Sequence, residues 1–161
     1  AAGGRSPAAA LLRANELLLS DARSGMFVTL FYGILDPEEG ELTFASAGHN
    51  PPYWLRRRGG ELVRLARRGI ALGVVENPSF EQDQIILRPG DALVLYTDGV
   101  TEAFDPDQQA FGEAGLQQAI RSAGAQPAEA MMAAINRAVQ AFVRGARQAD
   151  DYTLLVVARE A

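Results

Sequence analysis

Aspartates stand where one apolar segment of the sequence ends and another begins, and carboxylates in such positions can bind metal ions. Asp98 follows the apolar run 92–96 and precedes Gly99, whose missing Cβ lets the backbone and a ligand approach closely. Asp150 stands just before the apolar run 153–158. If the two runs are neighbouring antiparallel strands, the end of the first and the start of the second share one edge of the sheet. Asp98 and Asp150 would then converge, and converging carboxylates favour a cation.

The same residues also have a structural interpretation that needs no ligand. Asp98-Gly99 is a dipeptide typical of turns, and Asp150-Asp151 could be the solvated start of a strand. Spacing alone leaves these two interpretations open.

Two residue types are missing from the sequence, and this restricts the chemistry that the chain can perform. There is no cysteine, which excludes disulfides, thiolate metal sites and a cysteine nucleophile. A metal must therefore be held by oxygen ligands or by the single histidine, so Mg²⁺ or Mn²⁺ is the expected ion. All 15 basic residues are arginine, so the chain offers neither a Schiff-base lysine nor the lysine of a Walker motif.

The composition predicts a single folded domain over residues 1–161. This length is typical of one domain, and 48% hydrophobic residues are enough for a core. Twenty acidic residues against 15 basic ones give a net charge of −5, so we expect no nucleic-acid partner, because such proteins neutralise phosphates with positive charge. The apolar runs are far shorter than the roughly 20 residues that cross a bilayer, so we expect no membrane contact from this segment.

Hydrophobic patterning predicts the elements that position the aspartates. A helix is expected over about 6–20, where Ser6-Pro7 provides an N-cap and a first helical residue. Residues 26–35 are apolar on both faces and predict a central strand that is covered on both sides. A turn joins this strand to residues 41–47, so the two form a hairpin.

The middle of the chain, from residue 53 to residue 96, is predicted to be an antiparallel meander with tight turns between its strands. A helical hairpin is expected over about 111–144, followed by a last strand over 153–158. Strands followed by two helices and a returning strand imply an α+β fold with antiparallel sheets.

Four motifs, in this order along the chain, resemble those of the bacterial SpoIIE-like (RsbU-like) class of PPM-type metal-dependent serine/threonine phosphatases. They are AGHNPP at 47–52, GIALG at 69–73, YTDGVTEA at 96–103 and DDYTLL at 150–155. The resemblance runs from about Ser6 to the C-terminus, and the four motifs together make it specific.

The resemblance implies an antiparallel two-sheet β-sandwich flanked by helices, with a binuclear Mg²⁺ or Mn²⁺ centre that activates a water molecule to hydrolyse phosphoserine or phosphothreonine. Carried over by motif, Asp98 and Asp150 are metal ligands, while Gly99 and Asp151 support them. The implied substrate is a phosphorylated regulatory protein, for example an anti-sigma-factor antagonist, and the implied location is cytoplasmic.

The sequence departs from the family pattern at its beginning. Family members open with strands that carry an acidic motif and a GDxSGHG-like motif, and neither occurs here before Ser6. We therefore expect the C-terminal portion of such a domain, lacking its N-terminal strands and weakly active or inactive alone, because two aspartates cannot hold a tight binuclear pair. The alternative is a non-catalytic, phosphatase-like interaction module in a signalling pathway. Missing strands would also leave sheet edges exposed, which favours a homodimer or a strand swap.

Two further features have both a functional and a structural interpretation. His49 could be a general acid, but its Gly-His-Asn-Pro-Pro setting is typical of a turn that ends a strand, so we do not count it among the catalytic residues. The arginine runs 56–58 and 67–68 could attract an acidic or phosphorylated partner, but such runs are more often solvated hairpin tips.

Overall fold

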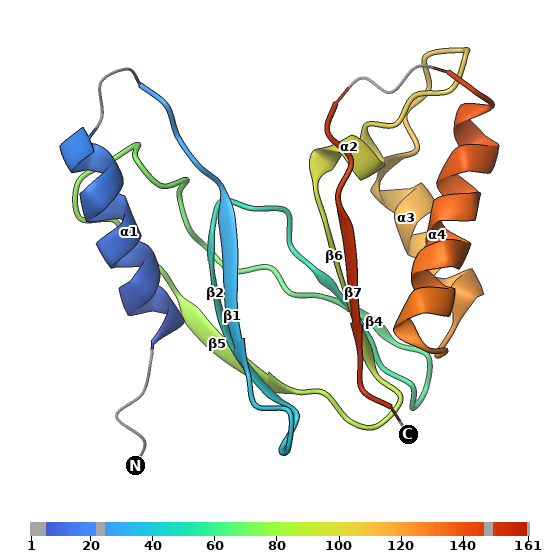
Figure 1. Ribbon diagram of the computed structural model, residues 1–161, viewed down its shortest axis with the longest axis horizontal. Coiled ribbons are helices and arrows are strands. Elements are labelled where there is room, and N and C mark those ends of the chain that lie inside the picture. The colour runs from blue at the N-terminus through green and yellow to red at the C-terminus, as the bar shows by residue number, and fades with distance from the viewer. Residues whose placement is uncertain (1–5, 22–24, 147–149, 161) are drawn as a thin grey trace. The chain divides into compact units, whose positions relative to one another are not determined.

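The computed structural model describes residues 6–21, 25–146 and 150–160 (Figure 1). Its backbone contacts divide the chain into two compact units, the first comprising Ala1–Pro51 and Ala66–Leu87 and the second Pro52–Leu65 and Arg88–Ala161. Each unit contains one antiparallel sheet. Within the described ranges, no helix has the length and apolar character needed to cross a membrane.

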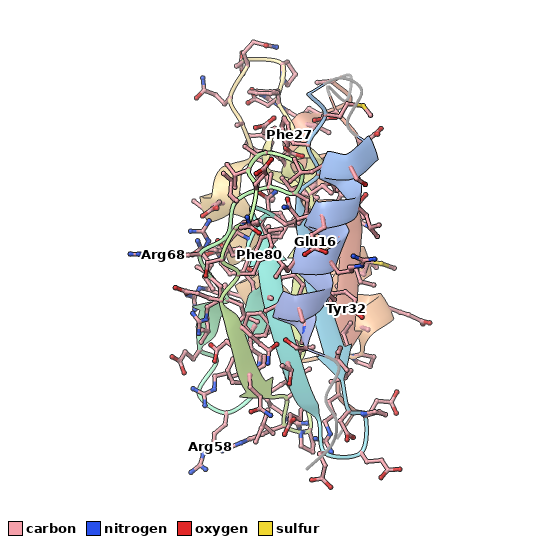
Figure 2. The ribbon with its side chains drawn as sticks, turned by 90° about the vertical axis from the view of Figure 1, so that its left-hand side faces the viewer. Glu16, Phe27, Tyr32, Arg58, Arg68 and Phe80 are labelled. Atoms are coloured by element: carbon pink, nitrogen blue, oxygen red, sulfur yellow. The ribbon has the colours of Figure 1, made fainter. Side chains whose placement is uncertain are left out.

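The first unit packs one helix against a three-stranded sheet (Figure 2). Its elements are α1 (Pro7–Asp21), β1 (Leu30–Leu35), β2 (Glu41–Ala47) and β5 (Gln82–Ile86), and the strand order is β1-β2-β5. The hydroxyl oxygen of Ser6 accepts a hydrogen bond from the Ala9 N–H at 3.2 Å, which caps α1 as the sequence predicted. Leu11 of α1 is buried against Ala45 and Ala47 of β2.

The second unit packs a helical hairpin against a four-stranded sheet. The strands are β3 (Tyr53–Leu55), β4 (Leu62–Arg64), β6 (Ala92–Tyr96) and β7 (Leu154–Ala158), in the order β4-β3-β6-β7. The helices are α2 (Asp98–Thr101), α3 (Gly112–Ala123) and α4 (Ala128–Val143). Val94 of β6, Ile120 of α3 and Ile135 of α4 are fully buried in the core of this unit.

Several predictions about the elements are confirmed. The first helix, the hairpin of β1 and β2, the helical hairpin of α3 and α4, and the returning strand β7 all form close to their expected bounds. The α+β class with two antiparallel sheets and flanking helices is also confirmed.

The predicted central position of strand 26–35 is wrong. β1 lies at the outer side of its three-stranded sheet, and none of its six residues is buried. Leu30 and Tyr32 remain 36% and 38% exposed, and Tyr32 is labelled in Figure 2. An apolar run indicates that a strand could be covered on both faces. The segments that would cover it are distant in sequence, so the pattern of the strand itself does not reveal whether they are there.

The predicted meander is also wrong, because the strand before the Arg88–Asp91 turn and the strand after it belong to different sheets. β5 pairs with β2, with Leu42 opposite Ile85, whereas β6 pairs with β3 and β7. The turn itself forms, since the Asp91 N–H donates to the Arg88 carbonyl at 2.8 Å. Turn composition therefore indicated a change of chain direction but not the partner of the next strand.

Candidate metal site at one end of strands β6 and β7

The two aspartate motifs meet because β6 and β7 are neighbouring antiparallel strands. Their register places Tyr96 opposite Leu154, so the end of β6 and the start of β7 lie at the same edge of the sheet. The pairing continues one residue further, since the Thr97 N–H donates to the Thr153 carbonyl at 3.1 Å. The condition under which the sequence brings the two aspartates together is therefore met.

Thr97 connects the two motifs through its side chain. Its hydroxyl donates to the Asp151 carbonyl oxygen at 3.0 Å and accepts a hydrogen bond from the Thr153 N–H at 3.0 Å. Thr97 occupies the N-cap position of α2 yet makes no side-chain cap, because its hydroxyl is engaged across the strands. This role is not evident from the sequence pattern, in which a threonine directly before Asp98 is the available signal.

Gly99 brings the backbones of the two motifs into direct contact. A Cβ atom built at this position would collide with the Asp151 carbonyl oxygen and would lie 2.8 Å from the Asp151 carbonyl carbon and 3.2 Å from the Tyr152 nitrogen. Because Gly99 is buried and its closest neighbours are backbone atoms, only glycine fits here without a shift of the chain.

The aspartate side chains themselves are on the surface. Asp98 begins the short helix α2 rather than a simple turn, and Asp98, Asp150 and Asp151 are all exposed. Asp98 and Asp150 share one local arrangement, in which a carboxylate oxygen accepts the N–H of the next residue, at 3.2 Å from Gly99 and at 2.7 Å from Asp151. The carbonyl oxygen of Asp98 also accepts the Thr101 hydroxyl at 3.1 Å.

The donor chemistry of this edge suits a hard cation, but the number of donors is small. Exposed carboxylates are the ligands that Mg²⁺ and Mn²⁺ prefer, and Mg²⁺ requires about six oxygen ligands, some of them waters. Among the residues that the structure describes, no group of three or more histidine, aspartate or glutamate side chains is placed to hold a metal ion. Asp98 and Asp150 thus form at most part of a ligand set, and their assignment as ligands stays a prediction.

A small cavity of about 170 Å³ lies beside Gly99, between α2, α4 and the start of β7. Tyr152 lines it and donates its hydroxyl to the Asn136 side-chain oxygen of α4 at 2.6 Å. Burial raises the pKa of the Tyr152 phenol above its ordinary value of 10.0. This contact anchors the segment that carries Asp151 to the helical hairpin.

His49 belongs to the first unit, whereas the aspartates belong to the second. Its Nδ1 atom forms a hydrogen bond with the Thr29 hydroxyl at 3.1 Å. This hydrogen bond gives His49 a contact within its own unit. A catalytic role for His49 is not tested by the structure.

Comparisons with known proteins agree with the motifs. The family described as Stage II sporulation protein E (SpoIIE) matches residues 1–160. Protein IcfG of Synechocystis is 34% identical over 134 residues, which are 83% of this chain and 21% of that protein. Phosphoserine phosphatase RsbU of Bacillus subtilis is 31% identical over 99 residues, which are 62% of this chain and 30% of that protein. The chain thus matches less than a third of the length of each curated relative.

A solved structure shows the same fold. The phosphatase domain of SpoIIE from Bacillus subtilis, presoaked with Mn, superposes with a TM-score of 0.71 at 18% identity, covering 99% of this chain and 68% of that one. Together with the family match over nearly the whole sequence, this places the chain in the SpoIIE family of PPM-type phosphatase domains.

Proposed function

We propose that the domain to which this chain belongs is a metal-dependent protein serine/threonine phosphatase. The observation that carries the proposal is the contact between the two aspartate motifs, in which Gly99 lies against the backbone of Asp151. Family membership supplies the reaction class, and this contact supplies a reason for the motifs to act together.

In this proposal Asp98 and Asp150 each contribute oxygen ligands to Mg²⁺ or Mn²⁺. Gly99 permits the close approach of the two motifs, and Asp151 supports the loop that carries Asp150. A binuclear centre, once bound, would supply an activated water and neutralise charge on the phosphoryl group. Because two carboxylates are too few for that centre, we expect this chain alone to be weakly active or inactive.

The proposed substrate is a phosphorylated regulatory protein. Support comes from RsbU, a relative that is named a phosphoserine phosphatase. By family analogy an anti-sigma-factor antagonist is the first substrate to test.

The test is Mn²⁺ binding by isothermal titration calorimetry together with hydrolysis of a phosphoserine peptide in excess Mn²⁺. We expect weak Mn²⁺ binding by the chain and at least about tenfold weaker binding by Asp98→Asn and by Asp150→Asn, because each loses a charged ligand. Glu129→Gln is the matched control, since Glu129 is an exposed carboxylate in the first turn of α4. Mn²⁺ affinity that is the same in all four proteins would contradict the ligand assignment, and normal turnover by this chain would contradict the expectation of weak or absent activity.

A second candidate is a non-catalytic interaction module that keeps the fold without turnover. The small donor set among the described residues favours it. The two candidates are distinguished in the complete parent protein, where an enzyme loses metal-dependent hydrolysis on Asp98→Asn and a module shows no hydrolysis to lose.

A further inference from the structure

The second unit has a cavity at the opposite end of β6 and β7 from the aspartates. This cavity, of about 180 Å³, is lined by three arginines and three small residues, and we name it the arginine pocket: Arg56, Arg57, Arg121, Gly60, Gly124 and Ala125. Leu55, the last residue of β3, also lines it and pairs with Ala92 at the start of β6. Tyr96, next to the aspartate site, stands four residues further along β6, which corresponds to about 13 Å of strand.

A buried carboxylate holds the chain segment that carries two of these arginines. Asp91 is only 3% exposed and accepts hydrogen bonds from the Arg57 N–H at 2.9 Å and from the Trp54 indole N–H at 3.1 Å. The Arg56 guanidinium lies over the Trp54 ring, with its central carbon 4.8 Å from the ring centroid, in a cation–π contact. Asp91 thus fixes the Arg57 backbone and the Trp54 ring against which the Arg56 guanidinium lies.

The Arg57 side chain also lies across the backbone of Gly90. A Cβ atom at Gly90 would collide with the Arg57 Cδ atom and would lie 2.9 Å from one of its terminal nitrogens. The positive φ of Gly90, 87°, is a second reason for glycine at this position. Arg57 is therefore held against the turn although it is exposed.

The charge of the pocket is not balanced by the acidic residues that the structure describes. Arg56 pairs with Glu61 at 2.8 Å, but neither Arg57 nor Arg121 has an ion pair within the described residues. No acidic side chain lines the pocket. A chain with a net charge of −5 has ample carboxylates, so a cavity with three arginines and no lining acid is a specific feature of this end of the sheet.

We propose that the arginine pocket binds a phosphate group in its dianionic form. Guanidinium groups present paired N–H donors that match phosphate oxygens, and organised arginines lose little entropy on binding. The site differs from the proposed catalytic edge in its residues and its end of the sheet, and it needs no metal. The phosphate group could come from the free ion or from a phosphorylated residue of a partner, which offer the same chemistry.

The experiment is a titration of the ¹⁵N-labelled chain with inorganic phosphate at constant ionic strength, with EDTA present so that no metal-dependent site contributes. We expect saturable shifts at the backbone amides of the pocket, with a dissociation constant on the order of 1 mM. Arg57→Gln or Arg121→Gln should weaken this binding at least about tenfold. Arg137→Gln is the matched control, because Arg137 is exposed on α4, outside the pocket, and forms no ion pair in the described ranges.

A phosphoserine peptide titrated in the same buffer identifies the source. Tighter binding by the peptide than by inorganic phosphate, lost in Arg57→Gln, would identify a phosphorylated partner, and equal binding would identify the free group. Shifts that never saturate with either probe, or an equal loss of affinity in Arg137→Gln, would overturn the proposal. Because metal is excluded, this result is independent of whether the aspartate edge supports phosphatase activity.

Discussion

Gly99 packs against the peptide group of Asp151 so closely that a Cβ atom at Gly99 would overlap the Asp151 carbonyl oxygen. The contact joins residues that are 52 positions apart in the sequence and that belong to two different motifs. It therefore links the backbones of the two segments that carry the predicted metal ligands Asp98 and Asp150.

Gly99→Ala should separate the two motifs and destabilise the second unit. The new methyl group would meet backbone atoms that cannot rotate away, so we expect a loss of about 2–3 kcal/mol in the free energy of unfolding, measured by urea denaturation with circular dichroism. Gly115→Ala in α3 is the control. The atoms nearest to the new methyl group belong to the Phe111 ring, which can move, and alanine favours the helical conformation more than glycine does. A larger loss of unfolding free energy in Gly115→Ala than in Gly99→Ala would show that the backbone contact at Gly99 is not rigid.

Thr97 offers a test of the hydrogen bonds that hold the motifs together. Thr97→Val keeps the shape of the side chain but removes the hydroxyl that bridges Asp151 and Thr153, so we expect a loss of about 1–2 kcal/mol in unfolding free energy. Mn²⁺ binding should weaken in parallel, because the Asp150 loop would no longer be fixed. Thr97→Ser retains the hydroxyl and should preserve Mn²⁺ affinity; equal Mn²⁺ affinity in the valine and serine variants would exclude this positioning role.

Alkaline pH should destabilise the second unit through its tyrosines. Burial raises the pKa of Tyr53, Tyr96 and Tyr152 above the ordinary value of 10.0, so the folded chain retains protons that the unfolded chain releases. The resulting stabilisation is complete below about pH 10 and is lost as the pH rises through the folded pKa values. Urea midpoints should therefore stay level from pH 8 to about pH 10 and fall between about pH 10 and pH 11.

Tyr152→Phe provides the control for this pH dependence. It removes one titrating group, so the unfolding free energy should fall less steeply above about pH 10, by up to about 1.4 kcal/mol per pH unit. It also removes the 2.6 Å hydrogen bond to Asn136, which should cost about 1 kcal/mol near neutral pH. A pH dependence unchanged by this substitution would mean that Tyr152 does not contribute.

The exposed edge of β1 leads us to propose self-association of this chain. Leu30 and Tyr32 lie on an outer strand that no further strand pairs with in the described part of the chain, and such edges favour pairing with a second copy. Sedimentation at high concentration should show a dimer, and Leu30→Lys should shift it towards monomer. Leu17→Lys in α1, where the leucine is 55% exposed and does not belong to the strand, should leave the dimer intact. A monomeric chain at every concentration would rule out this association.

The local elements could be predicted from the sequence, whereas the meeting of the two aspartate motifs could be predicted only if β6 and β7 were neighbours. Patterns with helical or strand periodicity reflect residues a few positions apart, which is why α1, the α3–α4 hairpin and β7 were recognised. The two apolar runs flanked by aspartates left the adjacency of β6 and β7 as a condition, and the resemblance to the family supplied the chemistry that would follow from it.

Only the tertiary structure decided the partners of the strands and the contacts that fix the site. β1 is an outer strand and β5 pairs with β2 because of segments far away in sequence, which the pattern of one strand does not encode. The same holds for Thr97, whose hydroxyl serves Asp151 and Thr153 across 54 and 56 positions instead of capping its own helix. Residue types thus determined which chemistry this protein can perform, whereas packing and hydrogen bonding between distant segments determined how its functional groups are held.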